Sequence, residues 1–182
     1  MKVTETGFQD LLVLEPSVFA DERGYFFESY NKLTLEKQGV SIPFVQDNQS
    51  FSKRGVLRGL HFQKAPSAQT KLVRALTGSI LDVVVDLRAA KPTYKKVYAI
   101  ELSGENHKQL LVPQGFAHSF VVLSETASVL YKCDDYYNKS AEGGIRFDDP
   151  ELNIHWPLPV SQLIVSFKDL ELPFLSNLNY HF

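Results

Sequence analysis

Apolar and polar residues alternate along most of the chain in short segments, which Gly, Pro, Asn or Asp separate from one another. A repeat of two places successive side chains on opposite faces, as in a half-buried β-strand. Short strands at regular intervals are typical of an all-β sandwich or barrel. The predicted strands lie within residues 7–16, 24–30, 44–52, 55–63, 70–78, 79–88, 95–103, 108–116, 118–124, 127–137 and 145–150.

Two segments depart from this alternation. The segment NKLTLEKQG, residues 31–39, predicts a helix that stops at Gly39, and SFKDLELPF, residues 166–174, predicts a short helical turn. The whole chain has 182 residues, a length typical of one compact domain. We therefore expect a single domain over residues 1–182, built from β-strands with short peripheral helices.

The segment GVLRGLHFQ, residues 55–63, places two polar side chains in an otherwise apolar strand. Strict alternation would put Arg58 and His61, three positions apart, on opposite faces of the sheet. Gly59 lies between them and allows a bulge or bend that changes this outcome. A packed core has no use for either charge, so the segment is a candidate for a reaction site.

Charge and composition exclude several classes of protein. The formal net charge is −2, which gives no global basic field for nucleic acid or an anionic membrane, so any anion site must be local. The one cysteine, Cys133, excludes a disulfide within the chain and suits a reducing compartment. No apolar run reaches signal-peptide or transmembrane length, so a cytoplasmic protein is expected.

Two histidines raise the question of a metal. The segment PQGFAHSF, residues 113–120, resembles the second motif of metal-binding cupins, but the first motif needs His-x-His and here reads His61 followed by Gln63. His61 and His118 supply two ligands, whereas a transition metal usually takes three or four. We therefore expect no metal. His61 is then either a satisfied structural histidine or a general base, because an imidazole titrates near neutral pH.

Other segments carry candidate chemistry beside ordinary structural interpretations. Lys71 lies in an apolar strand. It is either a surface residue whose ammonium snorkels to water or a cation placed near developing negative charge. Tyrosines 131, 136 and 137 either cover a sheet or donate protons and stack on a base. Taken by themselves, Lys168 and Asp169 predict only a charged, solvated turn. No phosphate-binding glycine loop or dinucleotide fingerprint is present in the sequence.

Together, these segments resemble one enzyme family over about residues 5 to 175. The ordered set DERGYFFESY, QDNQSFSKRGVLRGLHFQ, QTKLV, VVVDLR, LSGENHKQLLVPQGFAHSF and YKCDDYY is similar to the dTDP-4-dehydrorhamnose 3,5-epimerases. The resemblance implies a cupin-like jelly roll (a double-stranded β-helix) that works as a homodimer without a metal or other cofactor. It further implies a dTDP-sugar substrate, dTDP-4-keto-6-deoxyglucose, whose carbons C3 and C5 are inverted in dTDP-rhamnose biosynthesis.

The resemblance assigns roles to four residues. His61 matches the family's base, and Asp169 matches the carboxylate that orients the imidazole and stabilises its protonated form. Lys71 matches the cation beside the enolate oxygen. Tyr131 matches the acid that reprotonates carbon from the opposite face, and the neighbouring Lys132 is a candidate for lowering its pKa.

The resemblance also implies binding residues. Arg58 and Lys168 match diphosphate contacts, and Tyr137 is expected to stack on thymine. Further contacts to the nucleotide and the sugar are implied for Arg23, Glu28, Gln46, Asp47, Asn48, His118 and Glu142, with Arg23 and Glu28 expected to reach the partner subunit's site.

Two alternatives and one departure from the family pattern stay open. A sibling enzyme that epimerises only C3 or only C5 of a related 4-keto-6-deoxy sugar nucleotide would carry the same motif residues. A sugar-binding protein without catalysis, or a metal-dependent cupin, is the remaining class. The family usually reads Ala-His-Gly-Phe where this chain has Ser119, which either alters the fit of the sugar or is a neutral replacement.

Overall fold

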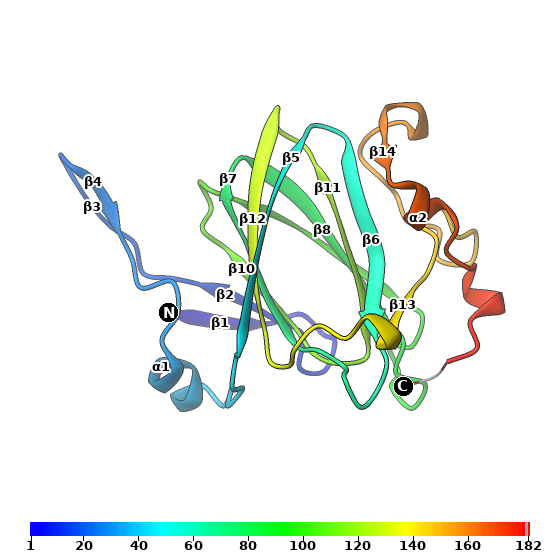
Figure 1. Cartoon of the computed structure of the whole chain (residues 1–182). Coiled ribbons are helices and arrows are strands. Elements are labelled where there is room, and N and C mark those ends of the chain that lie inside the picture. The colour runs from blue at the N-terminus through cyan, green and yellow to red at the C-terminus, as the bar shows by residue number, and fades with distance from the viewer. Residues whose placement is uncertain (181) are drawn as a thin grey trace.

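Two sheets, antiparallel except for the β14–β6 pair, face each other in this computed structural model, which describes residues 1–180 and 182. The first sheet has the strand order β1-β2-β10-β7-β12-β5, and the second has the order β13-β6-β11-β8-β9 with β14 paired to β6 (Figure 1). The strands are β1 (Lys2–Glu5), β2 (Leu12–Glu15), β5 (Gln46–Lys53), β6 (Val56–Gln63), β7 (Lys71–Thr77), β8 (Ser79–Asp86), β9 (Val97–Ser103), β10 (Gln109–Val112), β11 (Phe116–Val122), β12 (Thr126–Cys133), β13 (Glu142–Gly144) and β14 (Ile164–Val165).

The chain passes repeatedly from one sheet to the other. Strands β5, β7, β10 and β12 belong to the first sheet, whereas β6, β8, β9 and β11 belong to the second. This alternation is the connectivity of a double-sheet jelly roll. The predicted all-β class is therefore confirmed.

The core between the sheets follows the period-two pattern of the sequence. Val73 and Ala75 on β7 face Ile80 and Val84 on β8, and all four are buried in one cluster. Burial of such apolar surface is the main favourable contribution to folding. Leu14, Leu72 and Leu111 point the other way, onto the segment that includes the short helix α1 (Lys32–Lys37).

The outer face of the second sheet is covered by the C-terminal part of the chain. Leu60 and Phe62 pack there against Ile145, and Leu57 packs against Phe147. This covering segment contains β14, the helix α2 (Phe167–Leu170) and the 3-10 turns η2 (Val160–Gln162) and η3 (Leu175–Asn177), and it runs along the right side of Figure 1. A further 3-10 turn, η1 (Lys139–Ala141), comes just before β13.

Both predicted helices are confirmed. In α1, the Asn31 side chain accepts a hydrogen bond from Thr34 N–H at 3.1 Å, and Gly39 takes a φ of +84° just beyond the end. In α2, Ser166 caps the first turn in the same way, by accepting from Asp169 N–H at 3.1 Å. None of the helices in the described residues has the length and apolar character needed to cross a bilayer.

Some strand predictions are wrong at their limits. Residues 145–150 form turns and irregular structure, in which Asp149 N–H donates to the Arg146 carbonyl at 3.3 Å, and the strand β13 ends at Gly144. The strands β1 and β14 were not predicted, because they are short and lack a clear alternation.

A two-stranded hairpin projects away from the sandwich at the left of Figure 1. It is formed by β3 (Phe19–Asp21) and β4 (Gly24–Phe26). The sequence predicted one strand here, over residues 24–30, and did not predict β3. Phe19 and Phe26 on it are 67% and 71% exposed. A two-stranded hairpin is marginally stable alone, and here Tyr25 of β4 packs against His107, with ring centres 4.7 Å apart.

Candidate active site

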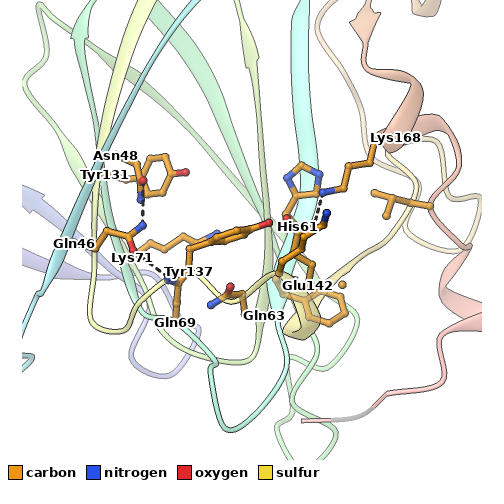
Figure 2. Close-up of a pocket in the computed structure, with 14 residues that line it drawn as sticks. Gln46, Asn48, His61, Gln63, Gln69, Lys71, Tyr131, Tyr137, Glu142 and Lys168 are labelled. Atoms are coloured by element: carbon orange, nitrogen blue, oxygen red, sulfur yellow. Dashed lines mark hydrogen bonds and ion pairs between the residues drawn. The ribbon is translucent and has the colours of Figure 1, made fainter.

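A cavity of about 390 Å³ lies between the inner faces of the two sheets (Figure 2). Strands β5, β7 and β12 supply one wall, and β6 with β13 supplies the other. The residues that line it are Gln46, Asn48, His61, Phe62, Gln63, Gln69, Lys71, Tyr131, Tyr137, Lys139, Glu142, Gly143, Lys168 and Leu172. The structure therefore brings together most of the site residues predicted from the sequence.

Strand β6 carries a bulge between Arg58 and His61. Opposite it on β11, His118 pairs with His61 and Phe120 pairs with Arg58, so three steps on β6 match two steps on β11. Gly59 takes a φ of +119° within this bulge, in the left-handed region that favours glycine. Both Arg58 and His61 consequently face the interior of the sandwich, so the bend hypothesis is confirmed over strict alternation.

His61 is held by Asp169, which is 108 positions away in the sequence. The His61 Nε2 atom lies 2.7 Å from Asp169 Oδ1, and Gly59 N–H donates to Asp169 Oδ2 at 3.3 Å. The His61 side chain is 41% exposed toward the cavity, whereas that of Asp169 is 5% exposed. The pair therefore presents an imidazole to the cavity and keeps its carboxylate in the wall.

The charge state of Asp169 follows from these contacts. Burial acts to raise the pKa of Asp169, but the hydrogen bond and charge of His61, the Gly59 N–H and the Ser166 hydroxyl together hold that pKa below its ordinary value. The carboxylate is therefore ionised at neutral pH. It accepts from His61 Nε2–H, which leaves the lone pair of Nδ1 available to take a proton.

Replacing Gly59 with alanine should damage this arrangement. A Cβ atom there would lie 2.5 Å from the His118 carbonyl oxygen and 2.8 Å from Ser119 Cα, in a backbone conformation that alanine rarely adopts. We expect Gly59→Ala to lower the free energy of unfolding by about 2–5 kcal/mol. Urea denaturation monitored by circular dichroism measures this.

The matched control is Gly39→Ala, at a φ of +84° with nothing within 4 Å of the added Cβ. Its cost should be about 1–2 kcal/mol, from backbone strain alone. Equal losses for the two variants would contradict the steric explanation of the bulge.

Lys71 and Tyr131 form the wall opposite His61 (Figure 2). Both lie on inner faces of the first sheet, and the Lys71 ammonium lies 5.8 Å from the centre of the Tyr131 ring. Burial lowers the pKa of Lys71, while Cys133 and Asp82 act to raise it. Lys71 is thus desolvated in the wall of the cavity and does not snorkel to the surface.

The phenol of Tyr131 keeps its proton at neutral pH. Burial raises the pKa of Tyr131, Cys133 adds to this, and only Arg58 acts to lower it. The prediction that Lys132 lowers this pKa is wrong. The Lys132 ammonium lies 3.0 Å from the Asp47 carboxylate and 5.0 Å from the centre of the Tyr30 ring, on the other face of the sheet.

At the side of the cavity next to His61, Lys168 pairs with Glu142. Their Nζ and Oε2 atoms are 2.6 Å apart, and this hydrogen bond holds the pKa of Glu142 below its ordinary value. A hydrogen bond with Glu142 in turn raises the pKa of Tyr137. The three side chains form one polar network beside His61, with a single cation that an anionic ligand can attract away from Glu142.

The predicted residues on β5 point to two different faces of the sheet, because side chains alternate along a strand. Gln46 and Asn48 line the cavity and are joined by a hydrogen bond of 3.1 Å, and Gln46 Oε1 also accepts from Tyr137 N–H at 3.0 Å. Asp47 points to the opposite face, where it pairs with Lys132. The side chains of Gln46 and Asn48 are therefore in the cavity, whereas that of Asp47 is outside it.

Two further predicted residues lie beside the cavity. The Arg58 guanidinium reaches from β6 to β5 in the other sheet, where it donates to Ser52 Oγ at 3.2 Å. His118 is 8% exposed, and its Nε2 atom lies 2.8 Å from Asp82 Oδ2. His118 shares with Lys71 a small void of about 10 Å³ behind the main cavity.

Arg23 and Glu28 are not at this cavity in the same chain. Arg23 lies at the tip of the β3–β4 hairpin, where its guanidinium pairs with Asp21. Glu28 follows the hairpin and accepts a hydrogen bond from Asn31 at 2.9 Å. Both are exposed.

The structure also locates two residues that the sequence left ambiguous. Ser119 is 1% exposed and does not line the cavity, since it follows His118 on β11 and faces the other way. Gln63 links the loops that contain Ser67 and Asn138. Its Nε2 donates to the Ser67 carbonyl at 2.7 Å, and its Oε1 accepts from Asn138 N–H at 2.7 Å. In the described residues, no group of three or more His, Cys, Asp or Glu is placed to hold a metal ion.

Several residues at the cavity were not predicted, among them three with polar side chains. Gln69 and Lys139 line it, and both lie in segments without a regular pattern that would indicate their direction. Asp82 lies behind it, and its signal was visible: a lone carboxylate within the apolar run ILDVVVD.

Chemically, this arrangement suits proton transfer at carbon. An imidazole with a free nitrogen lies on one wall, a protonated phenol lies on the other, and the Lys71 side chain lies beside the phenol. A base and an acid on opposite walls can remove a proton from one face of a substrate and return one to the other face. A lysine beside the acid, when charged, can stabilise an enolate oxygen.

Comparisons with known proteins agree with this chemistry. A family model described as dTDP-4-dehydrorhamnose 3,5-epimerase matches residues 5–177. The curated enzyme of that name from Salmonella typhimurium is 51% identical over 177 residues, which cover 96% of this chain and 96% of the relative.

Solved structures are similar over nearly the full length. The crystal structure of the epimerase from Elizabethkingia anophelis has a TM-score of 0.94 and 51% identity, with 99% of each chain covered. The Legionella pneumophila enzyme, in complex with dTDP-4-keto-L-rhamnose, has a TM-score of 0.93 and 43% identity, covering 98% of this chain and 94% of that one. A 3′-monoepimerase from Streptomyces bikiniensis, in complex with dTDP-quinovose, has a TM-score of 0.88 and 29% identity, with 93% and 86% covered.

The match along the chain includes the motif residues around the cavity, so the predicted family is confirmed. The predicted cupin-like jelly roll is confirmed by the same structures. The chain therefore belongs to the dTDP-4-dehydrorhamnose 3,5-epimerase family, and it is an isomerase.

Proposed function

We propose that the chain inverts both C3 and C5 of dTDP-4-keto-6-deoxyglucose and so forms dTDP-4-keto-L-rhamnose. The observation that carries this proposal is the placement of His61 and Tyr131 on opposite walls of one cavity, with Lys71 beside the phenol. The hydrogens at C3 and C5 are both adjacent to the C4 ketone, so one base and one cation can serve both carbons in turn.

Each inversion is a balanced pair of proton transfers. His61 Nδ1 takes the proton from the carbon while Asp169 accepts from Nε2–H, and the electron pair of the C–H bond becomes the enolate at C4. The Lys71 ammonium stabilises the negative oxygen. The Tyr131 phenol gives a proton to the opposite face of the carbon, and solvent restores both groups. No redox step and no metal is needed.

The nucleotide is held along the rest of the cavity. Lys168 and Arg58 attract the diphosphate, and Lys168 exchanges its pair with Glu142 for the phosphate oxygens. Tyr137 stacks on the thymine, and Gln46 and Asn48 hydrogen-bond the nucleoside. Glu142 and His118 contact the sugar. Asp47 contributes through its backbone, because its side chain pairs with Lys132 on the outer face.

A deuterium experiment tests this function. The enzyme is incubated with dTDP-4-keto-6-deoxyglucose in deuterated water, and the product is analysed by NMR. We expect label at both C3 and C5, with turnover unchanged by a chelator. Label at one carbon alone would favour the single-site alternative, for which the similarity to a 3′-monoepimerase is the supporting observation. Label at neither carbon would refute both.

We also propose a homodimer in which the β3–β4 hairpin completes the partner's site. The hairpin projects from the sandwich and exposes Phe19 and Phe26 (Figure 1), and it carries Arg23 away from the cavity of its own chain. Exposed aromatic side chains of this size commonly mark a protein interface. A cation delivered by the partner would add to the anion site that Lys168 and Arg58 begin.

Subunit mixing tests this arrangement. Arg23→Ala and His61→Asn homodimers should each be weakly active, but mixing and exchanging their subunits should restore about a quarter of wild-type activity. Half of the dimers are then hybrids, and one of their two sites has both an intact His61 and an intact partner Arg23. The control mixes His61→Asn with Lys71→Met, which damage the same site and should restore nothing. Hybrids that form without recovering activity would contradict the proposal.

A further inference from the structure

A buried carboxylate lies behind the cavity, at a position where the core would otherwise be apolar. Asp82 on β8 is completely buried, and its neighbours on the same face, Ile80 and Val84, belong to the core between the sheets. Placing a charged group there is unfavourable unless other groups compensate for the lost water. Its presence therefore needs an explanation beyond packing.

Within the described residues, Asp82 is only half satisfied. Its Oδ2 atom lies 2.8 Å from His118 Nε2, and its Oδ1 atom is buried with no hydrogen-bond partner. A carboxylate that served only to hold His118 would need one oxygen. The second oxygen is left without a partner in a region of low dielectric, where the electric field of a charged group extends farther than in water.

That field reaches Lys71, which enters the same region from the other sheet. Lys71 and His118 share the small void behind the cavity, and the charge of Asp82 favours the protonated form of the lysine. Cys133, the other group that favours it, is a neighbour of Lys71 across the β7–β12 ladder. The titratable groups around Lys71 are His61 on β6, Asp82 on β8, His118 on β11, Tyr131 and Cys133 on β12, and Tyr137, Lys139, Glu142 and Lys168 at the cavity.

We infer that Asp82 is a positioning residue for the reaction: its buried carboxylate is the fixed counter-charge that keeps the Lys71 ammonium charged, and its hydrogen bond fixes the His118 ring between them. The carboxylate lies behind the lysine in the wall and does not touch the substrate. Its catalytic meaning rests on the proposed function, in which Lys71 stabilises the enolate.

The physical need for such a residue is direct. An ammonium removed from water loses its solvation and tends to lose its proton, and a neutral amine would stabilise an enolate far less. A counter-charge on the cavity side of the lysine would compete with the substrate oxygen. A carboxylate on the core side offsets the desolvation and leaves the cavity side of the ammonium free.

Asp82→Asn tests this role, since it removes the charge with little change of shape. We expect kcat to fall by about 10- to 100-fold while KM changes by less than about threefold. Removal of the negative charge makes the ammonium lose its proton at lower pH. The basic limb of the kcat profile should therefore move to lower pH, by about one unit or more.

The matched control is Asp86→Asn. Asp86 lies on the same strand and is equally buried, but it pairs with Arg88 and Thr93. Its loss should lower stability and leave the pH profile of kcat in place. If Asp82→Asn also leaves the basic limb unmoved, Asp82 is merely structural and the inference is wrong.

A second measurement needs neither turnover nor a substitution of Asp82. Lysine labelled with ¹³C at Cε in the wild-type enzyme reports the protonation of Lys71 by NMR, with the resonance assigned through Lys71→Arg. We expect Lys71 to remain charged at pH 8, and a Lys71 that is neutral there would overturn the inference. If the wild-type enzyme failed to epimerise its substrate, the proposed function would fail, and this titration would still decide the charge of Lys71.

Discussion

His61→Asn should lower kcat by about 10²- to 10⁴-fold, the usual contribution of a positioned general base. Asparagine can still occupy the space beside Asp169, but it has no lone pair able to accept a proton from carbon at neutral pH. The Kd for dTDP should change by less than about twofold, because the cations expected to hold the diphosphate, Lys168 and Arg58, are retained. A turnover assay measures kcat, and calorimetric titration with dTDP measures the Kd.

Deuterium exchange makes this prediction sharper. If His61 removes both protons, then the asparagine variant should fail to exchange hydrogen at C3 and at C5 alike. Exchange lost at only one carbon would mean that a second base serves the other. His155→Asn is the control, since His155 is exposed and outside the cavity, and it should behave as wild type. Near-normal turnover of His61→Asn would refute the assignment of the base.

Tyr131→Phe should separate proton removal from inversion. The variant keeps the ring that packs beside Lys71 but lacks the proton that the phenol supplies to the opposite face. We expect formation of the inverted product to fall by about 10²- to 10⁴-fold. His61 can still remove a proton and return a deuteron to the same face, so recovered substrate should carry label without inversion.

The result depends on Tyr131 being protonated in the wild-type enzyme. Burial raises its pKa, so the phenol holds its proton across neutral pH and loses it only at a pH above the ordinary range of tyrosine. Tyr136→Phe is the matched control, because Tyr136 is 67% exposed and does not line the cavity. If exchange and inversion fell together in Tyr131→Phe, then the tyrosine would act on proton removal and not on delivery.

Local pattern predicted much of the fold correctly. Alternation identified most strands of the sandwich, and its interruption at residues 31–39 and 166–174 indicated both helices, because side-chain direction depends on neighbours in the chain. The same alternation on β5 sorts Gln46 and Asn48 to the cavity and Asp47 to the outer face. The limits of strands were less predictable, as at residues 145–150, because a turn there closes through a backbone hydrogen bond that periodicity does not encode.

By itself, the sequence determined the all-β class, the family and the set of side chains available for chemistry, because motif order and residue type are local properties. Only the tertiary structure decided how these side chains meet. It brought Asp169 to His61 across 108 positions, turned Arg58 and His61 to one face by a bulge, and paired the buried Asp82 with His118. It also set Arg23 apart on a hairpin. These outcomes depend on which strands lie opposite one another, a non-local choice that the packing of the whole sandwich makes.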